Sequence, residues 1–332
     1  MNTRSIYFYI LNYNPNRKKW NIHLVVFFVF GICIWAGFGF KEASRKQVFH
    51  GVIPVDLSTD TIGELSIITY NIAGLPEPLS SAPTSRASSI SVIGQKLNRY
   101  DIVNVQEDFS YNNELYQTGN SHIYRTEPMK GLPFGDGLNT LSKYPIIFHE
   151  RIAWEACSGT DCLAPKGFSF TRIQLAKDSY VHVYNLHATA QNTAAAVKAR
   201  RQNLEQLAAF INEYSKDEPL LVMGDFNASY AFSGDRLHEF LKHTRLDDCW
   251  VLLQNNGKFP SIRYSFMPAE KLSITDSCES IDKIYFRSSP NLKFYPLQYK
   301  MDKGVFSTID GQPLSDHCPV ALTLKWELTD LK

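Results

Sequence analysis

The sequence has few cysteines, and no two of them stand in a C-x-x-C arrangement. There are six in 332 residues, and the missing arrangement is the one common in structural zinc sites, so the pattern argues against such a site. Cys157 and Cys162 bracket the short stretch CSGTDC. They could form a local disulfide if this part of the chain lies outside the cytoplasm, and the sequence leaves that point open.

Most of the chain lacks an excess of basic residues. Residues 1–46 hold seven lysine or arginine residues and one glutamate, so a net charge of +1 for the whole chain leaves −5 for the remainder. A weakly acidic domain does not attract polyphosphate chains in general, which argues against a non-specific nucleic-acid binder. A basic group on one predicted helix, Lys198, Arg200 and Arg201, is expected to form a solvated face.

Residues 20–40 contain no Asp, Glu, Lys or Arg, and basic residues flank them on both sides. An uncharged run of this length can cross a bilayer as a helix, and its lack of a polar face argues against a buried core helix. We expect a single-pass signal anchor, with the rest of the chain on the non-cytoplasmic side. The alternative is secretion after cleavage, although the apolar part exceeds the usual ~7–15 residues of a signal peptide.

The expected organisation has a short tail at 1–19, the anchor at 20–40, and a polar linker at 41–62. Composition beyond that is globular, with 44% hydrophobic and 20% charged residues overall, and no internal repeat is visible. Strand patterns alternate with helix patterns, of which ISVIGQKLNRY and the long stretch 192–218 are the helical ones. The strand candidates are ELSIITYN, DIVNVQE, LNTLSKYPI, FSFTRIQL, SYVHVYNLH, SIDKIYFR and VALTLKWEL. This mixture predicts a layered α/β domain that contains two packed sheets.

Polar residues suited to phosphoester chemistry follow or end these strands. They are Asn71, Glu107, His187, Asp225 with Asn227, Asp282, and the pair Asp316 and His317 before the last strand. Carboxylate and amide oxygens suit a hard ion such as Mg²⁺ or Mn²⁺. Imidazoles exchange protons near neutral pH. Such a set at several strand ends predicts metal-assisted hydrolysis of a phosphodiester.

The stretch LLVMGDFNAS illustrates the two interpretations that a single strand end allows. Gly224 is expected to let the backbone turn, and Asp225 and Asn227 would project to the same side of an extended chain. A plain strand followed by an Asx turn would have the same sequence. By contrast, His182 is an odd number of positions from His187, so it should face the other way and serve packing or the surface.

The ordered motifs SIITYNIAG, VNVQEDF, VYNLHATA, MGDFNAS, SIDKIYF and LSDHCPV resemble those of the endonuclease/exonuclease/phosphatase superfamily. The resemblance covers residues 63–328. It implies an α/β fold, a four-layer sandwich of two packed mixed sheets flanked by helices and similar to pancreatic deoxyribonuclease. It also implies a divalent-metal phosphoesterase whose active site lies at one edge of the sheets.

The resemblance assigns the metal, Mg²⁺ or Mn²⁺, to Glu107, with Asn71 and Asp316 nearby. It assigns the general base to His317, with Asp282 as the acid that orients it.

By the same resemblance, His187 stabilises the phosphate or protonates the leaving oxygen, while Asp225 and Asn227 hold the phosphate and water. Some superfamily members are argued to use the aspartate at the position of Asp225 as the base, so the choice between it and His317 stays open.

The stretch ACSGTDCLAPKGFSFTRIQL is similar to secreted bacterial neutral sphingomyelinases, through Asp161, Leu163, Lys166 and Gly167. A membrane phospholipid, such as sphingomyelin or a related choline or ethanolamine lipid, is therefore the expected substrate. One departure is that LKFYPLQYKMDKGVFSTIDGQ lacks the tryptophan of the aromatic hairpin that inserts into the bilayer in those enzymes.

Three alternatives remain at this point. A nuclease acting on DNA or RNA is the first, because GDFNA is common in that branch of the superfamily. A phosphoinositide phosphatase is disfavoured, because CESIDKI replaces the Trp-Cys-Asp-Arg motif of that group. An inactive binding module is also disfavoured, because no expected catalytic position is substituted. The sequence does not indicate an oligomeric state.

Overall fold

The computed structural model describes residues 45–47, 57–131, 134–263 and 273–329. The chain divides into two units, residues 1–43 and 44–332, and the described residues all belong to the second. The expected tail at 1–19 and anchor at 20–40 lie outside the described residues. None of the helices among the described residues is long and apolar enough to cross a membrane.

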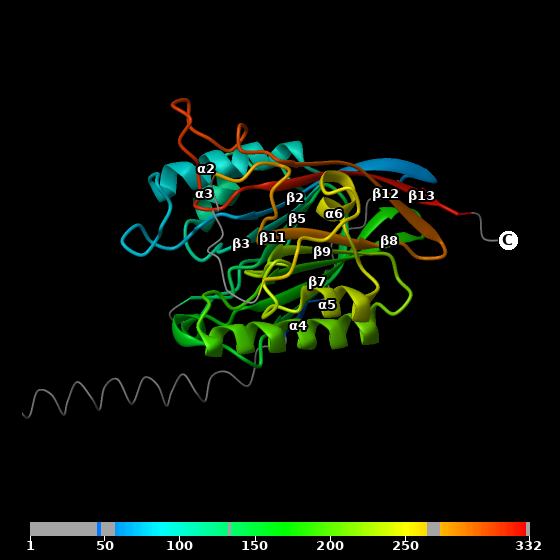
Figure 1. Ribbon diagram of the computed structural model, residues 1–332. Coiled ribbons are helices and arrows are strands. Elements are labelled where there is room, and N and C mark those ends of the chain that lie inside the picture. The colour runs from blue at the N-terminus through cyan, green and yellow to red at the C-terminus, as the bar shows by residue number, and fades with distance from the viewer. Residues whose placement is uncertain (1–44, 48–56, 132–133, 264–272, 330–332) are drawn as a thin grey trace, which may run out of the picture. The chain divides into compact units, whose positions relative to one another are not determined.

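Two mixed β-sheets form the centre of the second unit (Figure 1). The larger sheet contains, in spatial order, β1 (Arg45–Gln47), β6 (Ile146–Ala153), β7 (Gly167–Ala176), β8 (Ser179–His187), β9 (Leu220–Asp225), β11 (Asp282–Arg287) and β10 (Asp247–Asp248). The smaller sheet contains β12 (Leu292–Met301), β13 (Val320–Leu328), β2 (Ile62–Asn71), β3 (Ile102–Gln106), β5 (Asn139–Ser142) and β4 (Tyr124–Arg125). Each sheet has one parallel pair, β8–β9 and β2–β3, among antiparallel neighbours.

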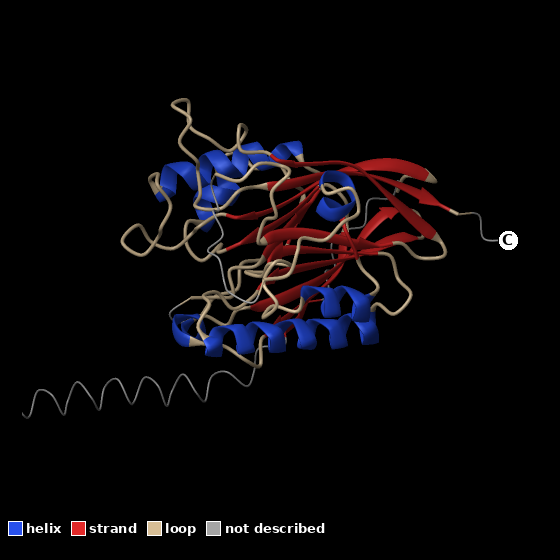
Figure 2. Ribbon diagram, viewed as in Figure 1, coloured by secondary structure: helices blue, strands red, loops and turns tan. Residues whose placement is uncertain are grey.

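Helices cover the outer faces of the two sheets (Figure 2). The smaller sheet packs against α2 (Arg86–Lys96), which continues as the 3₁₀ turn η1 (Leu97–Arg99), and against α3 (Asn112–Gln117). The larger sheet packs against α4 (Ala194–Tyr214) and α5 (Leu237–Thr244). The remaining described helices are η2 (Gly159–Leu163) and α6 (Cys249–Gln254). The expected pair of packed mixed sheets with flanking helices is confirmed.

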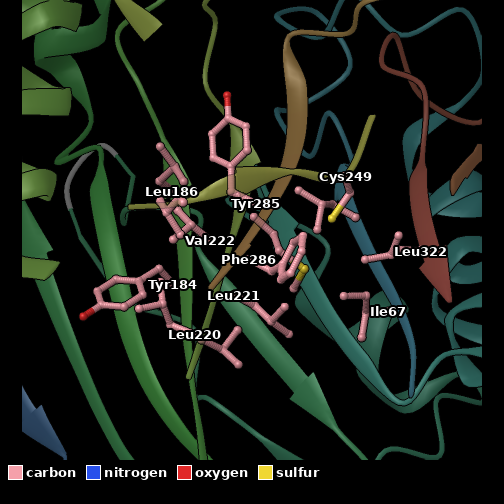
Figure 3. Packing of buried hydrophobic residues seen from close by; sticks show 14 of the residues in the cluster. Ile67, Tyr184, Leu186, Leu220, Leu221, Val222, Cys249, Tyr285, Phe286 and Leu322 are labelled. Atoms are coloured by element: carbon pink, nitrogen blue, oxygen red, sulfur yellow. The ribbon is translucent and has the colours of Figure 1, made fainter. Parts of the chain in front are cut away.

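Apolar residues on both faces of β2 explain its central position. Leu65 and Ile67 belong to the core between the sheets, whereas Ile68 and Tyr70 belong to the cluster under α2. A strand with apolar side chains on both of its faces is buried on both sides. Figure 3 shows Ile67 and its neighbours packed between the sheets. The same alternation places the side chain of Asn71 on the inner face, toward the other sheet.

Amide side chains connect the sheets on the way to the edge that holds the polar residues. Gln106 Nε2 donates to Asn185 Oδ1 at 2.7 Å, and Asn185 Nδ2 donates to the carbonyl of Val105 at 2.9 Å. Asn104 Nδ2 donates to the carbonyl of Tyr184 at 3.0 Å. These buried bonds are costly to leave unmade, so they fix how the two sheets meet at this edge.

Two predictions about single residues are wrong. Arg200 was expected on a solvated face, but its side chain is fully buried, while Lys198 is exposed. Gly224 was expected to turn the chain, but it lies inside β9, and a Cβ there would be 2.2 Å from the carbonyl oxygen of Leu186. The glycine therefore allows close strand packing, and the strand ends one residue later at Asp225.

Two segments have a different secondary structure from the one predicted. Part of the expected linker at 41–62 is strand β1, which pairs with β6. The predicted strand LNTLSKYPI is divided, because β5 ends at Ser142 and β6 begins at Ile146.

Candidate active site

Strand register brings three of the predicted residues side by side at one edge of the larger sheet. His187 is paired with Asp225 across β8 and β9, and Asp225 is paired with Asp282 across β9 and β11. Side chains of directly paired residues lie on the same face of a sheet. The smaller sheet contributes Asn71, the last residue of β2, and Glu107, which follows β3.

Asn71 links the two halves of this cluster. Its Nδ2 donates to Glu107 Oε1 at 2.9 Å and to Asp225 Oδ2 at 3.1 Å, and it lies 3.4 Å from His317 Nε2. Its Oδ1 accepts a hydrogen bond from the backbone N–H of Ala73 at 3.1 Å. The amide thus presents its nitrogen, and not its oxygen, to the carboxylates.

A carboxylate holds the imidazole of His317 through its Nδ1 atom. Its Nδ1 donates to Asp282, 2.9 Å from Oδ2 and 3.2 Å from Oδ1, and both side chains are 2% exposed. The hydrogen bond places the proton on Nδ1, which leaves a lone pair on Nε2. Nε2 lies 3.7 Å from Asp225 Oδ2, so this nitrogen faces the acidic cluster.

His187 faces the same carboxylate from the opposite side. Its Nε2 is 3.4 Å from Asp225 Oδ2 and 4.0 Å from Glu107 Oε1. The ammonium of Lys166 donates to the same nitrogen at 3.0 Å. Lys166 is in turn paired with Asp161 at 2.7 Å. These contacts surround Asp225 with an amide and two imidazoles.

Lys166 and Asp161 are site residues that the sequence pointed to only through a resemblance. Lys166 immediately precedes β7, and pairing of β7 with β8 brings it beside His187. Asp161 lies in η2, inside the loop that Cys157 and Cys162 close with a disulfide. Its Oδ2 accepts the backbone N–H of Ala190 at 2.6 Å. No local pattern in the sequence marks a lysine before a strand as a neighbour of a histidine 21 positions away.

Asn227 lies in an Asx turn and not on an extended chain, so the expectation that it projects beside Asp225 from a strand is wrong. Its backbone N–H donates to Asp225 Oδ1 at 2.9 Å, which is an Asx turn, and its φ is 49°. Its side chain donates to the carbonyl of Ala188 at 3.2 Å. The turn therefore exists, and it holds one oxygen of Asp225 while leaving the other to the cluster.

Glu107 has a constrained backbone. Its φ is 58°, a left-handed conformation that is uncommon for residues with a side chain. Gly74 donates its N–H to the carbonyl of Glu107 at 2.9 Å, and a Cβ on Gly74 would lie 2.3 Å from that oxygen. Such conformations persist where surrounding structure enforces them, and they gather at functional sites.

The donor set fits a hard divalent cation. Asp225, Asp282 and His317 offer ligand atoms within 4.8 Å of one another, but Asp282 is committed to the imidazole. Glu107 is more accessible, with 21% of its side chain exposed against 1% for Asp225. Magnesium retains several waters when it binds proteins, so an accessible carboxylate suits it better than a buried one.

Burial raises the pKa of Glu107, while Lys166, Asn71 and His317 oppose that shift and Asp316 adds to it. A divalent cation would favour the charged carboxylate and offset the burial.

Asp316 is half-buried and acts electrostatically on both Glu107 and Arg86. The structure thus brings all eight predicted residues to one edge, with Asp316 at the margin of the cluster, and their individual roles stay predictions.

Residues 84–323 match the sequence model of the Endonuclease/Exonuclease/phosphatase family 2. The chain belongs to the endonuclease/exonuclease/phosphatase family. The family predicted from the sequence motifs is therefore confirmed.

Two relatives of this chain are both named as sphingomyelinases. The sphingomyelinase of Mycobacterium tuberculosis is 36% identical over 292 residues, which are 86% of this chain and 56% of the relative. Sphingomyelinase C of Bacillus cereus is 26% identical over 204 residues, which are 53% of this chain and 61% of the relative. The chain thus spans little more than half the length of these relatives.

Solved structures share the family fold at low sequence identity. The beta toxin of Staphylococcus aureus, in a structure with bound magnesium ions, has a TM-score of 0.57 at 18% identity, covering 78% of this chain and 99% of the toxin. TDP2 of D. rerio, complexed with a single-strand DNA product, has a TM-score of 0.57 at 15% identity, covering 79% and 99%. At these identities the likeness establishes the fold alone.

Proposed function

We propose that this chain is a divalent-metal-dependent phosphodiesterase that hydrolyses sphingomyelin to phosphocholine and ceramide. The names of its relatives support the substrate. The single observation that carries the chemistry is the hydrogen-bonded pair Asp282–His317, in which Nε2 of His317 faces Asp225 and the amide of Asn71.

In the proposed reaction, His317 is the general base. A water molecule that attacks phosphorus gives its proton to the lone pair on His317 Nε2, and Asp282 stabilises the resulting imidazolium through Nδ1–H. Both groups are almost fully buried. An interaction between a charged imidazole and a carboxylate is stronger there than in water.

Lys166 and His187 occupy the other side of the cluster. Their hydrogen bond places a proton between Nζ and Nε2, where it is available to the leaving oxygen as the bond from phosphorus to the lipid oxygen breaks. Asp161 keeps the ammonium in place at 2.7 Å. The positive charge of this pair is also available to a phosphate oxygen.

Glu107 would hold the metal, for which we propose Mg²⁺, with Asn71 and Asp316 as its neighbours. A bound divalent cation supplies charge that polarises the phosphoryl group. Asn71 presents Nδ2 to the carboxylates, so coordination through its oxygen would require rotation of the amide by 180° and loss of the bond from Ala73.

Asp225 is the alternative base, because its Oδ2 is within 3.7 Å of both imidazole Nε2 atoms. Against this role, Asn71 already donates to Oδ2 and the Asn227 N–H to Oδ1. A carboxylate that accepts such bonds has a reduced tendency to take a proton. Asp225 is therefore better suited to orienting the groups around the phosphate.

One comparison of substrates tests the proposal. The full chain with Mg²⁺ is given sphingomyelin vesicles, plasmid DNA and a soluble phosphoinositide in parallel. We expect release of phosphocholine and little nicking of the plasmid. Nicking without release of phosphocholine would favour the nuclease alternative. TDP2, which shares the fold, was solved with a single-strand DNA product. Inactivity on all three substrates would count against a phosphoesterase.

We also propose that residues 20–40 anchor the chain in a membrane, with the catalytic residues on the non-cytoplasmic side. Secretion after cleavage remains the alternative. The Cys157–Cys162 disulfide supports either version, because disulfides persist mainly in oxidising compartments.

A further inference from the structure

The two largest fully buried side chains among the described residues are both arginines, Arg86 and Arg200. They are 1% and 0% exposed. A buried guanidinium is costly unless all its donors are used. Each arginine lies on the helix that connects the strands of a parallel pair, with α2 between β2 and β3 and α4 between β8 and β9.

Arg86 joins the segment that follows Asn71 to the loop that carries His317. Its Nε donates to the carbonyl of Ala73 at 3.0 Å, and its Nη2 donates to that of Ile72 at 2.6 Å. Its Nη1 donates to the carbonyl of Leu314 at 2.9 Å. The first two acceptors directly follow Asn71, and the third precedes His317 by three positions.

Ser315 adds two hydrogen bonds between the same two segments that Arg86 connects. Its hydroxyl donates to the backbone carbonyl of Asn71 at 2.7 Å and accepts the N–H of His317 at 3.3 Å. The guanidinium and this hydroxyl together leave little freedom between the end of β2 and the loop before β13.

Arg200 makes the corresponding junction in the larger sheet. Its Nη1 donates to the carbonyls of Thr189 at 3.1 Å and Gln191 at 2.6 Å, in the loop that follows His187. Its Nε donates to Asp235 Oδ1 at 2.9 Å. Asp235 Oδ2 accepts the backbone N–H of Ser229 at 2.8 Å, two positions after Asn227.

We infer that Arg86 and Arg200 are positioning residues for catalysis, each fixing two active-site loops against each other. Arg86 sets the distance between Asn71 and the base His317, and Arg200 sets His187 relative to Asn227. The inference rests on the proposed function for its catalytic consequence, but the geometry itself can be measured without any substrate.

The chemistry of the guanidinium explains why arginine is needed at both places. Its five N–H groups lie in a rigid plane, so one side chain can donate to carbonyls of two loops at once. The ammonium of lysine keeps the charge but is a compact group with three donors on a flexible stem. An Arg→Lys change therefore removes the bridge while it preserves the charge.

The test compares Arg86→Lys and Arg200→Lys in the full chain. With ¹⁵N-labelled histidine, and without metal or substrate, we expect Arg86→Lys to shift the imidazole signals of His317 and leave those of His187 in place. Arg200→Lys should do the reverse. With sphingomyelin and Mg²⁺, each change should lower kcat by ~10²-fold with little change in KM, because misplacement by about 1 Å costs that much.

Arg99→Lys and Arg201→Lys are the matched controls, since neither residue donates to these loops in the described structure and neither is fully buried. They should leave signals and rate unchanged. Wild-type signals and rates in the two test variants would overturn the inference, as would equal shifts of both histidines in each. If the wild-type chain hydrolyses no phosphodiester, the proposed function fails, and the pattern of imidazole signals alone decides the inference.

A lysine variant that does not fold is replaced by a milder change. Arg86→Gln keeps two amide donors, and Asp235→Asn removes the charge that faces Arg200 while keeping its size. The same selective shifts are expected, and smaller losses of kcat, about 10-fold. If these variants also fail to fold, the arginines hold the fold itself and the positioning role is overturned.

Discussion

At the scale of single residues, the orientation of one imidazole decides what the cluster can do. Nδ1 of His317 is committed to Asp282, and the neighbouring groups approach Nε2. His317→Ala should lower kcat by at least about 10²-fold, the usual contribution of a general base. The wild-type rate should rise with pH as the base loses its proton. Steady-state assays across pH would measure both effects.

His243→Ala is the control for that change, because this histidine is exposed on α5. A near-normal rate in the His317 variant would transfer the role of base to Asp225.

Glu107 is predicted to carry the metal dependence. Chelation should abolish hydrolysis, and added Mg²⁺ should restore it. Glu107→Gln removes the charge but keeps the shape, so it should weaken Mg²⁺ binding without unfolding the domain. Calorimetric titration with Mg²⁺ alone, beside a thermal unfolding curve, would separate these effects. Full activity in excess chelator would exclude the metal site.

His182 is buried away from the cluster, as its odd spacing from His187 predicted, and its Nδ1 lies 2.7 Å from the hydroxyl of Ser215. Burial lowers its pKa to about 4, with Arg172 and Arg287 adding to the shift. Between pH 6.5 and 4 the unfolded chain therefore binds a proton that the folded chain does not, so stability falls as pH falls. The loss should approach about 3 kcal/mol.

Urea unfolding at pH 7 and pH 4.5 would measure this loss for the wild type and for His182→Gln. The variant should show a smaller change between the two pH values, whatever its stability at pH 7. An equal change in both proteins would assign the pH dependence to other groups.

At the scale of elements, the loop closed by Cys157 and Cys162 lies against the candidate active site, at the start of β7 and the end of β8. The disulfide encloses Asp161, which holds both Lys166 and the N–H of Ala190. Replacing both cysteines with serine should lower the free energy of unfolding by about 2 kcal/mol through the added freedom of the unfolded chain. Because Asp161 also loses its restraint, we expect kcat to fall by a larger factor than the fraction of folded protein does.

Circular dichroism melts and assays at a temperature where the double variant is folded would test this prediction. Mild reduction of the wild type should reproduce the loss of activity, and reduction of the serine variant should have no effect. A fully active double variant would confine the disulfide to stability.

At the scale of the whole molecule, the topology proposal can be tested on sealed cells or vesicles. We expect the full chain to stay with the membrane and its catalytic part to be cut by protease only from the non-cytoplasmic side. The reason is the uncharged run at 20–40 with more basic charge before it than shortly after it. A soluble chain that begins near residue 40 would establish cleavage. A catalytic part exposed to the cytoplasm would contradict both versions.

Elements with a clean periodicity could be predicted from the sequence. The strand SYVHVYNLH has the predicted bounds, and the long helix differs by only a few residues at each end. Strand β12 was missed because a bulge between Pro296 and Gln298 interrupts its alternation, and because several of its residues are exposed. Helix α5 was missed because eight residues hold only a short apolar stripe.

The sequence by itself determined the family, the two-sheet fold and the residue types at the strand ends, because periodicity and motif order are local properties of the chain. Only the tertiary structure decided which of those residues meet. Strand register placed Asp225 beside His187 and Asp282, and strand pairing brought Lys166 to the site. Burial of Arg200 could not be predicted either, since a charged residue near a helix start has the same local pattern whether water or two loops satisfy its donors.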